Sequence, residues 1–118
     1  MTDLPEAAPP DHFDEYQLVF LWSSGDHVEL GHSDADRLQR QHLGHLEAMR
    51  EAGHLLAAGP LFDQPDPRLR GICIYRTESN ARARELATSD PAVRAGQLQI
   101  EVMGWRTRPD ALQAGRKA

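Results

Sequence analysis

The sequence has few of the features that mark secreted or membrane proteins. It contains one cysteine, Cys73, among 118 residues, so no disulfide can form within the chain. Its longest apolar run covers only residues 18–22, whereas a helix that crosses a bilayer needs about 20 apolar residues. The N-terminal residues are acidic and proline-rich, unlike the basic and then apolar start of a signal peptide. We therefore expect a cytoplasmic protein without membrane contact.

Basic residues are in the minority as well. The chain has 13 Lys and Arg against 18 Asp and Glu, for a net charge of −5. The basic side chains are scattered rather than gathered into a stripe, so they predict no surface that follows a phosphate backbone. The glycines do not form a Rossmann or P-loop pattern. The sequence therefore argues against a nucleic acid partner and indicates no nucleotide cofactor.

The composition predicts one domain with two loose ends. A chain of this length with 40% hydrophobic residues can build one core. Residues 1–14 are rich in proline and charge and have no apolar periodicity, and the residues from 107 onward follow the last apolar run. We predict a flexible N-terminal arm over 1–14, a domain over 15–106 and a flexible C-terminal tail over 107–118.

Four stretches have the composition of strands, and two have the caps and composition of helices. The expected strands cover residues 16–22, 55–58, 71–76 and 97–106. The expected helices begin at Ser33–Asp36 and at Asn80 and run to about Ala52 and Thr88, with a short turn after Pro91. We expect Gly53 to close the first helix, Ser79 to cap the second, and Gly59-Pro60 to stop the second strand.

The order β-α-β-β-α-β is that of ferredoxin-like α+β folds with a four-stranded antiparallel sheet. Right-handed crossovers place both helices on one face of this sheet. The first strand is apolar on both sides, with Leu18 and Phe20 on one and Val19 and Leu21 on the other, which predicts a central position with cover above and below. Met103 adds to the side without helices. We therefore expect a homodimer whose facing sheets enclose a small-molecule pocket.

One histidine of the first helix stands on its apolar stripe. His42 falls among Leu38, Leu46 and Met49 on the helical wheel and should point into the protein. It needs a partner there, since an unpaired buried imidazole loses hydration of about 1–3 kcal/mol. Three interpretations stay open: a core histidine bonded to backbone, a metal ligand with His45, or a site histidine oriented by a carboxylate. No third ligand is obvious, so no metal site is predicted.

Other reactive side chains carry weaker signals. Cys73 lies inside an expected strand without a basic neighbour, which is typical of an inert buried thiol. Either Tyr16 or Tyr75 could bring a hydroxyl to the pocket, and the connection over 59–70 is long enough to act as a lid. We expect the remaining pocket walls to come from sheet residues that face the dimer centre.

Two segments are similar to known motifs. Residues 42–60, HLGHLEAMREAGHLLAAGP, and the turn Ser89-Asp90-Pro91 resemble the signatures of YCII-related (YciI-like) proteins in order and spacing. The resemblance covers about residues 16–106. It implies a dimeric α+β barrel on the ferredoxin-like plan and an active-site His-Asp pair, which matches His42 and Asp90 here. An aspartate before proline is also an ordinary N-cap, so Asp90 could serve both roles.

Such a pair suggests two classes of function. A carboxylate bonded to one ring nitrogen leaves the other nitrogen as a general base. The resemblance then implies a cofactor-independent lyase or isomerase in which His42 abstracts a proton and Asp90 orients it. The alternatives are a non-catalytic metabolite-binding or accessory dimer and a purely structural dimer. The sequence identifies neither the ligand nor the reaction.

Overall fold

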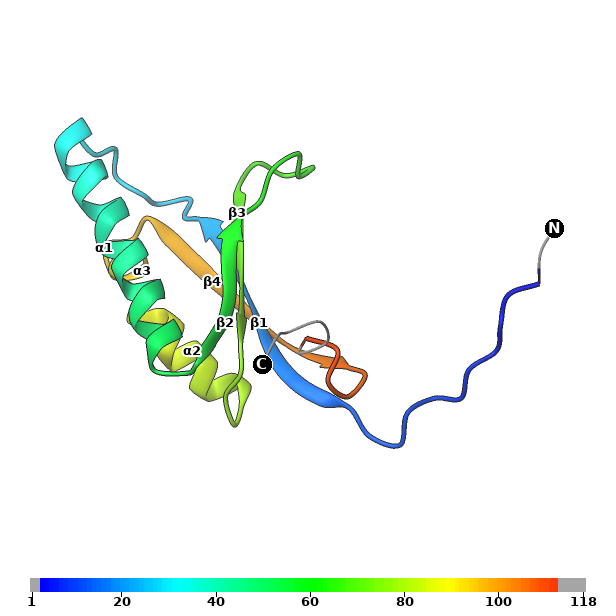
Figure 1. Cartoon of the computed structure of the whole chain (residues 1–118). Helices are drawn as coiled ribbons and strands as arrows, with labels where there is room; N and C mark the ends of the chain where they lie inside the picture. Colours follow the sequence, from blue (N-terminus) through cyan, green and yellow to red (C-terminus); the bar gives the residue numbers. More distant parts are fainter. Residues whose placement is uncertain (1–2, 113–118) are drawn as a thin grey trace.

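The chain folds into one four-stranded sheet with helices on one side (Figure 1). The structure is a computed structural model that describes residues 3–112. Its elements, in order, are β1 (Asp14–Ser23), α1 (His32–Glu51), β2 (Leu55–Pro60), β3 (Leu69–Tyr75), α2 (Asn80–Thr88), α3 (Pro91–Arg94) and β4 (Leu98–Thr107). The strands are antiparallel in the order β2-β3-β1-β4. The predicted ferredoxin-like α+β fold is confirmed, with β1 inside the sheet.

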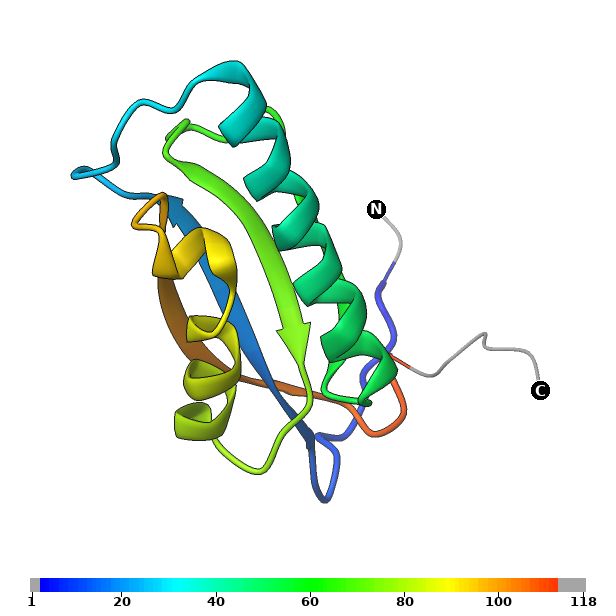
Figure 2. The ribbon, with the colours of Figure 1, turned by 90° about the vertical axis from the view of Figure 1, so that its left-hand side faces the viewer.

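All helices cover the same face of the sheet, as Figure 2 shows. Helix α1 packs against β2 and α3, while α2 packs against β1 and β4. The opposite face carries no helix among the described residues (Figure 1). This arrangement follows from the right-handed crossovers of the two β-α-β units.

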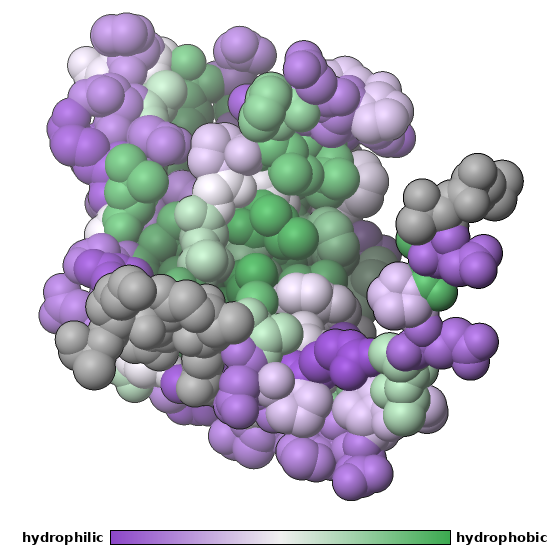
Figure 3. All heavy atoms as spheres, turned by 45° about the vertical axis from the view of Figure 1, so that its right-hand side comes forward, coloured by the Kyte–Doolittle hydropathy of each residue, from purple (hydrophilic) through white to green (hydrophobic). Residues whose placement is uncertain are grey.

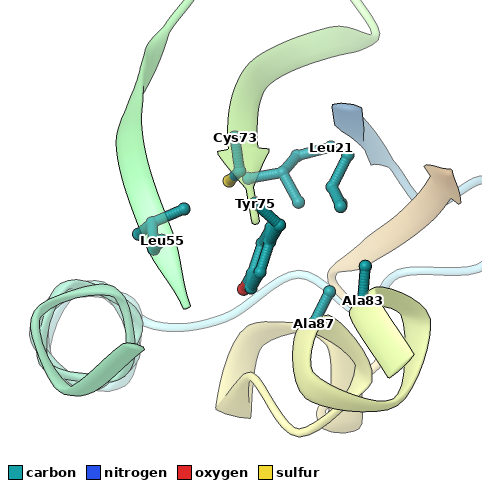
Figure 4. Packing of buried hydrophobic residues seen from close by; sticks show 7 residues of the cluster. Leu21, Leu55, Cys73, Tyr75, Ala83 and Ala87 are labelled. Atoms are coloured by element: carbon teal, nitrogen blue, oxygen red, sulfur yellow. The ribbon is translucent and has the colours of Figure 1, made fainter. Parts of the chain in front are cut away.

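Alternation along β1 separates the two faces. Val19 is fully buried on the helix side, opposite Cys73 of β3 and Val102 of β4. Tyr75 reaches from β3 toward the helices in the same core (Figure 4). The buried cluster consists of Val19, Leu21, Leu55, Cys73, Tyr75, Ala83 and Ala87.

The face without helices is apolar at its centre (Figure 3). Leu18 lies there, opposite Ile74 of β3 and Met103 of β4 in the pairing register. Met103 is 43% exposed, and Leu18 and Ile74 are only half-buried. The expected apolar face is therefore present, and no helix of residues 3–112 covers it.

The helix caps agree with the sequence in two places and differ in one. Gly53 follows α1 with φ +84°, a left-handed conformation that suits glycine. The Ser79 hydroxyl accepts the amide of Arg82 at 3.0 Å at the start of α2. Helix α1, however, begins at His32 after an extended Gly31, and no side chain caps it. Ser33 therefore lies inside the helix and not at its boundary, because the first helical hydrogen bond already runs from the amide of Ala35 to the carbonyl oxygen of Gly31.

The end of β2 also differs from the prediction. Pro60 does not stop the strand but belongs to it, paired with Gly71 of β3. This is possible because β2 is an edge strand, where a missing N–H can face solvent. The connection to β3 is therefore limited to residues 61–68, with no helix or strand.

The domain limits lie close to the first and last strands. β1 begins at Asp14 and β4 ends at Thr107, and residues 3–13 form neither helix nor strand. Residues 1–2 of the predicted arm and 113–118 of the predicted tail lie outside the described residues. None of the helices in the described part of the chain is long and apolar enough to cross a membrane.

Candidate functional site

A cavity of about 590 Å³ lies between α1 and the sheet. Its walls come from the inner side of α1, the ends of β1 and β2, and the starts of β3 and β4. His42 and Cys73 line it from opposite walls, one on the helix and one on the sheet. The apolar lining residues are Leu21, Leu30, Ala35, Leu38, Leu43, Leu46, Ala58, Pro60, Ala92 and Leu98.

Small residues explain why this space is hollow. Beneath α1 the strands present Ala58 and Gly71, whose side chains cannot fill the gap between helix and sheet. Helix α1 accordingly has no fully buried residue. A Cβ at Gly71 would lie 2.9 Å from the carbonyl oxygen of Gly59, so glycine is required where β2 and β3 approach. The cavity that His42 lines therefore lies on the helix-covered face, opposite to the predicted dimer-facing side.

His42 and Asp90 are in direct contact. Nδ1 of His42 lies 2.6 Å from Oδ2 of Asp90, and the two side chains are 12% and 3% exposed. The other oxygen, Oδ1, accepts the amide of Ala92 at 2.8 Å. Asp90 is thus the N-cap of α3, with Pro91 at the first helical position, as the sequence indicated. Both carboxylate oxygens are occupied, so the carboxylate is fixed in one orientation.

The bond between the two side chains fixes which ring nitrogen of His42 carries the hydrogen. A carboxylate can only accept, so Nδ1 of His42 carries the hydrogen and donates it. In the neutral ring, Nε2 then has a free lone pair. His42 is also one of the residues that line the cavity.

A second histidine lies beside the pair. Nε2 of His45 is buried without a hydrogen-bond partner among the described residues. Burial lowers the pKa of His45, and His42 lowers it further, while the nearby Asp90 raises it. His45 therefore favours the neutral state. The two histidines do not complete a metal site, since no group of three or more ligating side chains occurs in residues 3–112.

Cys73 and Tyr75, on the sheet side of the core, do not ionise readily. Burial, followed by the charge of Asp90, raises the pKa of Cys73 to about 12, so its thiol stays protonated. The pKa of Tyr75 is raised by burial, with smaller contributions from Cys73 and Asp90. Tyr16 lies on the other face, where its ring centroid is 6.1 Å from that of Trp105. Neither tyrosine is among the described residues that line the cavity.

Some features of the site could not be found from sequence. The connection over 59–70 was expected to act as a lid, and only its ends, Gly59, Pro60 and Arg70, line the cavity. The loop over 61–68 between them contributes none of the described lining residues, and its Phe62 is exposed. In its place, the cavity has polar lining from Gln39 on α1 and from His27 in the segment before α1. Gln39 precedes His42 by three positions, a helical spacing that could have indicated it. His27 had no such signal.

Comparison with known proteins places the chain in a family. The profile of the YCII-related domain matches residues 18–106, and no curated protein sequence matches. One similar solved structure is the 5-chloro-2-hydroxyhydroquinone dehydrochlorinase (TftG) from Burkholderia phenoliruptrix AC1100, in complex with 2,5-dihydroxybenzoquinone. It has a TM-score of 0.55 and 19% identity, covering 76% of this chain and 92% of that chain. This likeness supports the fold, and the profile match shows that the chain belongs to the YCII-related domain family.

Proposed function

We propose that the protein binds a small molecule in the α1 cavity and that His42 acts on it as a general base, in a cofactor-independent lyase or isomerase reaction. The observation that carries this proposal is the 2.6 Å contact between Nδ1 of His42 and Oδ2 of Asp90 at the cavity wall. It supports a fixed tautomer in which Nδ1 holds the hydrogen and Nε2 is the ring atom left to accept a proton, which is the usual arrangement of a histidine base.

The proposed step needs no group beyond this pair. Nε2 of His42 takes a proton from a carbon next to a carbonyl, or from a phenolic hydroxyl. The electron pair of the broken bond moves into the adjoining conjugated system. In an elimination it expels a leaving group from the neighbouring carbon, and in an isomerisation the imidazolium returns the proton to another carbon. Asp90 stabilises the imidazolium in either case.

The cavity favours a compact ligand with an apolar body. About half of the residues that line it are aliphatic, and the polar lining side chains are Ser23, His27, Gln39, His42, Arg70 and Gln97. The solved relative TftG is named as a dehydrochlorinase and holds 2,5-dihydroxybenzoquinone. Small oxygenated rings are therefore the first compounds to test.

The proposed working unit is a homodimer. The face without helices carries Leu18, Ile74 and Met103 at its centre, and an apolar sheet face of this kind is costly to leave in water. A second copy supplies a matching face across a two-fold axis. In this arrangement the two α1 cavities lie on the outer sides of the dimer.

A ligand screen with a paired variant tests the proposal. Thermal unfolding of the wild type and of His42→Ala would be measured with a panel of phenols, hydroquinones and quinones, including 2,5-dihydroxybenzoquinone. We expect at least one compound to stabilise the wild type and not the variant, and to be converted by the wild type alone. A compound that binds both proteins equally contradicts the role of His42. A compound that requires His42 but is never converted identifies a binding module.

A further inference from the structure

We propose that His27 is the second polar anchor of the cavity and selects ligands with an oxygen substituent remote from the group that meets His42. This inference rests on the proposed function, since it concerns the same cavity. It assigns a specificity role to a residue outside the His42–Asp90 pair.

The position of His27 is the first support. It lies in the segment of residues 24–31 that joins β1 to α1, and it lines the same cavity as His42. The two histidines come from different elements, one before α1 and one in the middle of it. Along α1, the lining residues Ala35 and His42 are separated by two turns, a distance of about 10 Å. The cavity is thus long enough to separate two polar ends of a ligand.

A contact within its own segment fixes the tautomer of His27. Its Nδ1 lies 2.6 Å from the carbonyl oxygen of Ser24. A carbonyl oxygen can only accept, so Nδ1 carries the hydrogen and Nε2 is the ring atom left for a ligand. This repeats the arrangement at His42, with a backbone carbonyl in place of the carboxylate.

The segment itself is tied to the rest of the protein. Ser24 is 5% exposed, and its amide donates to the carbonyl oxygen of Gln97 at 3.0 Å. The side-chain amide of Gln97 donates in turn to the carbonyl oxygen of Val28 at 2.8 Å. These bonds on both sides of His27 fix its backbone against the start of β4. An exposed ring on a fixed backbone loses less conformational entropy on binding than one on a free loop.

The other lining residues bear on the ligand chemistry. Leu21, Leu38 and Leu98 line the cavity together with the two histidines and offer apolar contact, and Arg70 adds a guanidinium group. A neutral imidazole Nε2 accepts a hydrogen bond from a hydroxyl group. The fitting ligand therefore has a flat apolar body, one reactive group at His42 and a hydroxyl at the far end that donates to His27.

Two matched pairs of compounds test this selection. Phenol is compared with hydroquinone, and 4-hydroxybiphenyl with 4,4′-dihydroxybiphenyl, so each pair differs only in the far hydroxyl and the pairs differ in length. Binding to the wild type would be measured by calorimetry. In the pair whose length fits, we expect the second hydroxyl to increase the affinity by about 2- to 10-fold, the effect of one hydrogen bond.

Variants separate this inference from the proposed function. His27→Ala should remove the gain from the second hydroxyl, while His27→Gln, which keeps a polar group at a similar reach, should retain part of it. His32→Ala is the matched control, because His32 is exposed near the same segment and is absent from the described cavity lining. It should leave the gain unchanged.

The outcomes lead to different conclusions. If the compounds bind and depend on His42, but the gain is absent in the wild type or survives in His27→Ala, the inference fails and the proposed function stands. If none of the four compounds binds the wild type, the proposed function fails for phenols and the inference fails with it.

Discussion

The carboxylate of Asp90 lies 2.6 Å from Nδ1 of His42 through Oδ2, while its Oδ1 caps helix α3 at the amide of Ala92. The orientation of the histidine therefore depends on a helix N-terminus that is part of the fold. A cap of this kind is formed as soon as the helix is formed, so the proposed base needs no ligand to orient it.

We expect Asp90→Asn to keep the cap and reverse the tautomer of His42. The asparagine oxygen can still accept the amide of Ala92, but its NH₂ group can only donate toward His42. Nδ1 must then become the acceptor, and the ring hydrogen moves to Nε2. The ¹⁵N chemical shifts of the ring would report this exchange. Any turnover should fall by about 10²- to 10⁴-fold, whereas unchanged turnover would remove Asp90 from the mechanism.

Removal of the His42 ring should destabilise the fold, because Asp90 then loses its buried hydrogen-bond partner. His42→Leu leaves a carboxylate that is 3% exposed without its side-chain partner, at a cost of about 1–3 kcal/mol. Urea unfolding measures the free energy. The double variant His42→Leu with Asp90→Asn should recover part of the loss, because a neutral amide is less costly to bury than a charge. A double variant that is less stable than the single one would contradict this account.

His45 should make stability depend on pH. Its folded-state pKa lies below the ordinary value of 6.5, chiefly because of burial. Above 6.5 the ring is neutral in both states and has no effect. Below 6.5 the unfolded chain binds the proton first, so the free energy of unfolding falls with falling pH until the folded-state pKa is reached. Urea unfolding between about pH 5 and 7.5 would show this slope.

His45→Met is the control for that slope. The replacement fills similar space without a titrating group, while the other histidines remain. We expect a flatter pH dependence than in the wild type over the acidic side of 6.5. Equal slopes in the two proteins would show that His45 is not responsible.

Two glycines of β2 and β3 should respond differently to alanine. Gly71→Ala brings a Cβ to 2.9 Å from the carbonyl oxygen of Gly59, and the required shift of β2 against β3 costs about 1–3 kcal/mol. Gly59→Ala is the matched control, since its Cβ would meet no atom within 4 Å. Thermal unfolding of both variants tests the difference. Similar stabilities would contradict the close approach.

A charge on the open sheet face should separate the proposed dimer. Met103→Lys places a charge on the open sheet face of each copy, which the proposed interface would have to bury. Sedimentation velocity at micromolar concentration should show a dimer for the wild type and a monomer for the variant. Val28→Lys, at an exposed apolar residue away from that face, should remain dimeric. A monomeric wild type would overturn the proposed assembly.

The sequence predicted the parts of this structure that depend on local pattern. The alternation along β1 fixed its two faces, and the Asp90-Pro91 step predicted both a cap and a helix start. The position of the cavity, in contrast, depends on which small residues of β2 and β3 lie beneath α1. Gly59 and Gly71 come together only through strand pairing, which no local pattern contains.

His27 was missed for a related reason. Its part in the cavity depends on hydrogen bonds between residues 24–28 and Gln97, more than sixty positions away in the chain. A histidine in a loop has no periodicity to interpret. The predicted end of β2 was wrong as well. Proline usually stops a strand, but Pro60 lies on an edge strand, where it needs no hydrogen-bonded N–H.

Small residues beneath α1 set the size of the cavity, and they are separate from the His42–Asp90 pair. Ala58 and Ala92 line the cavity, yet the oxygens of Asp90 are held by His42 and by a backbone amide, which any residue at position 92 except proline supplies. Exchange of the exposed Ala58 for a larger side chain would narrow the cavity without a change in the groups that hold Asp90. Related chains that differ at this position would accept differently shaped molecules while keeping the proposed base.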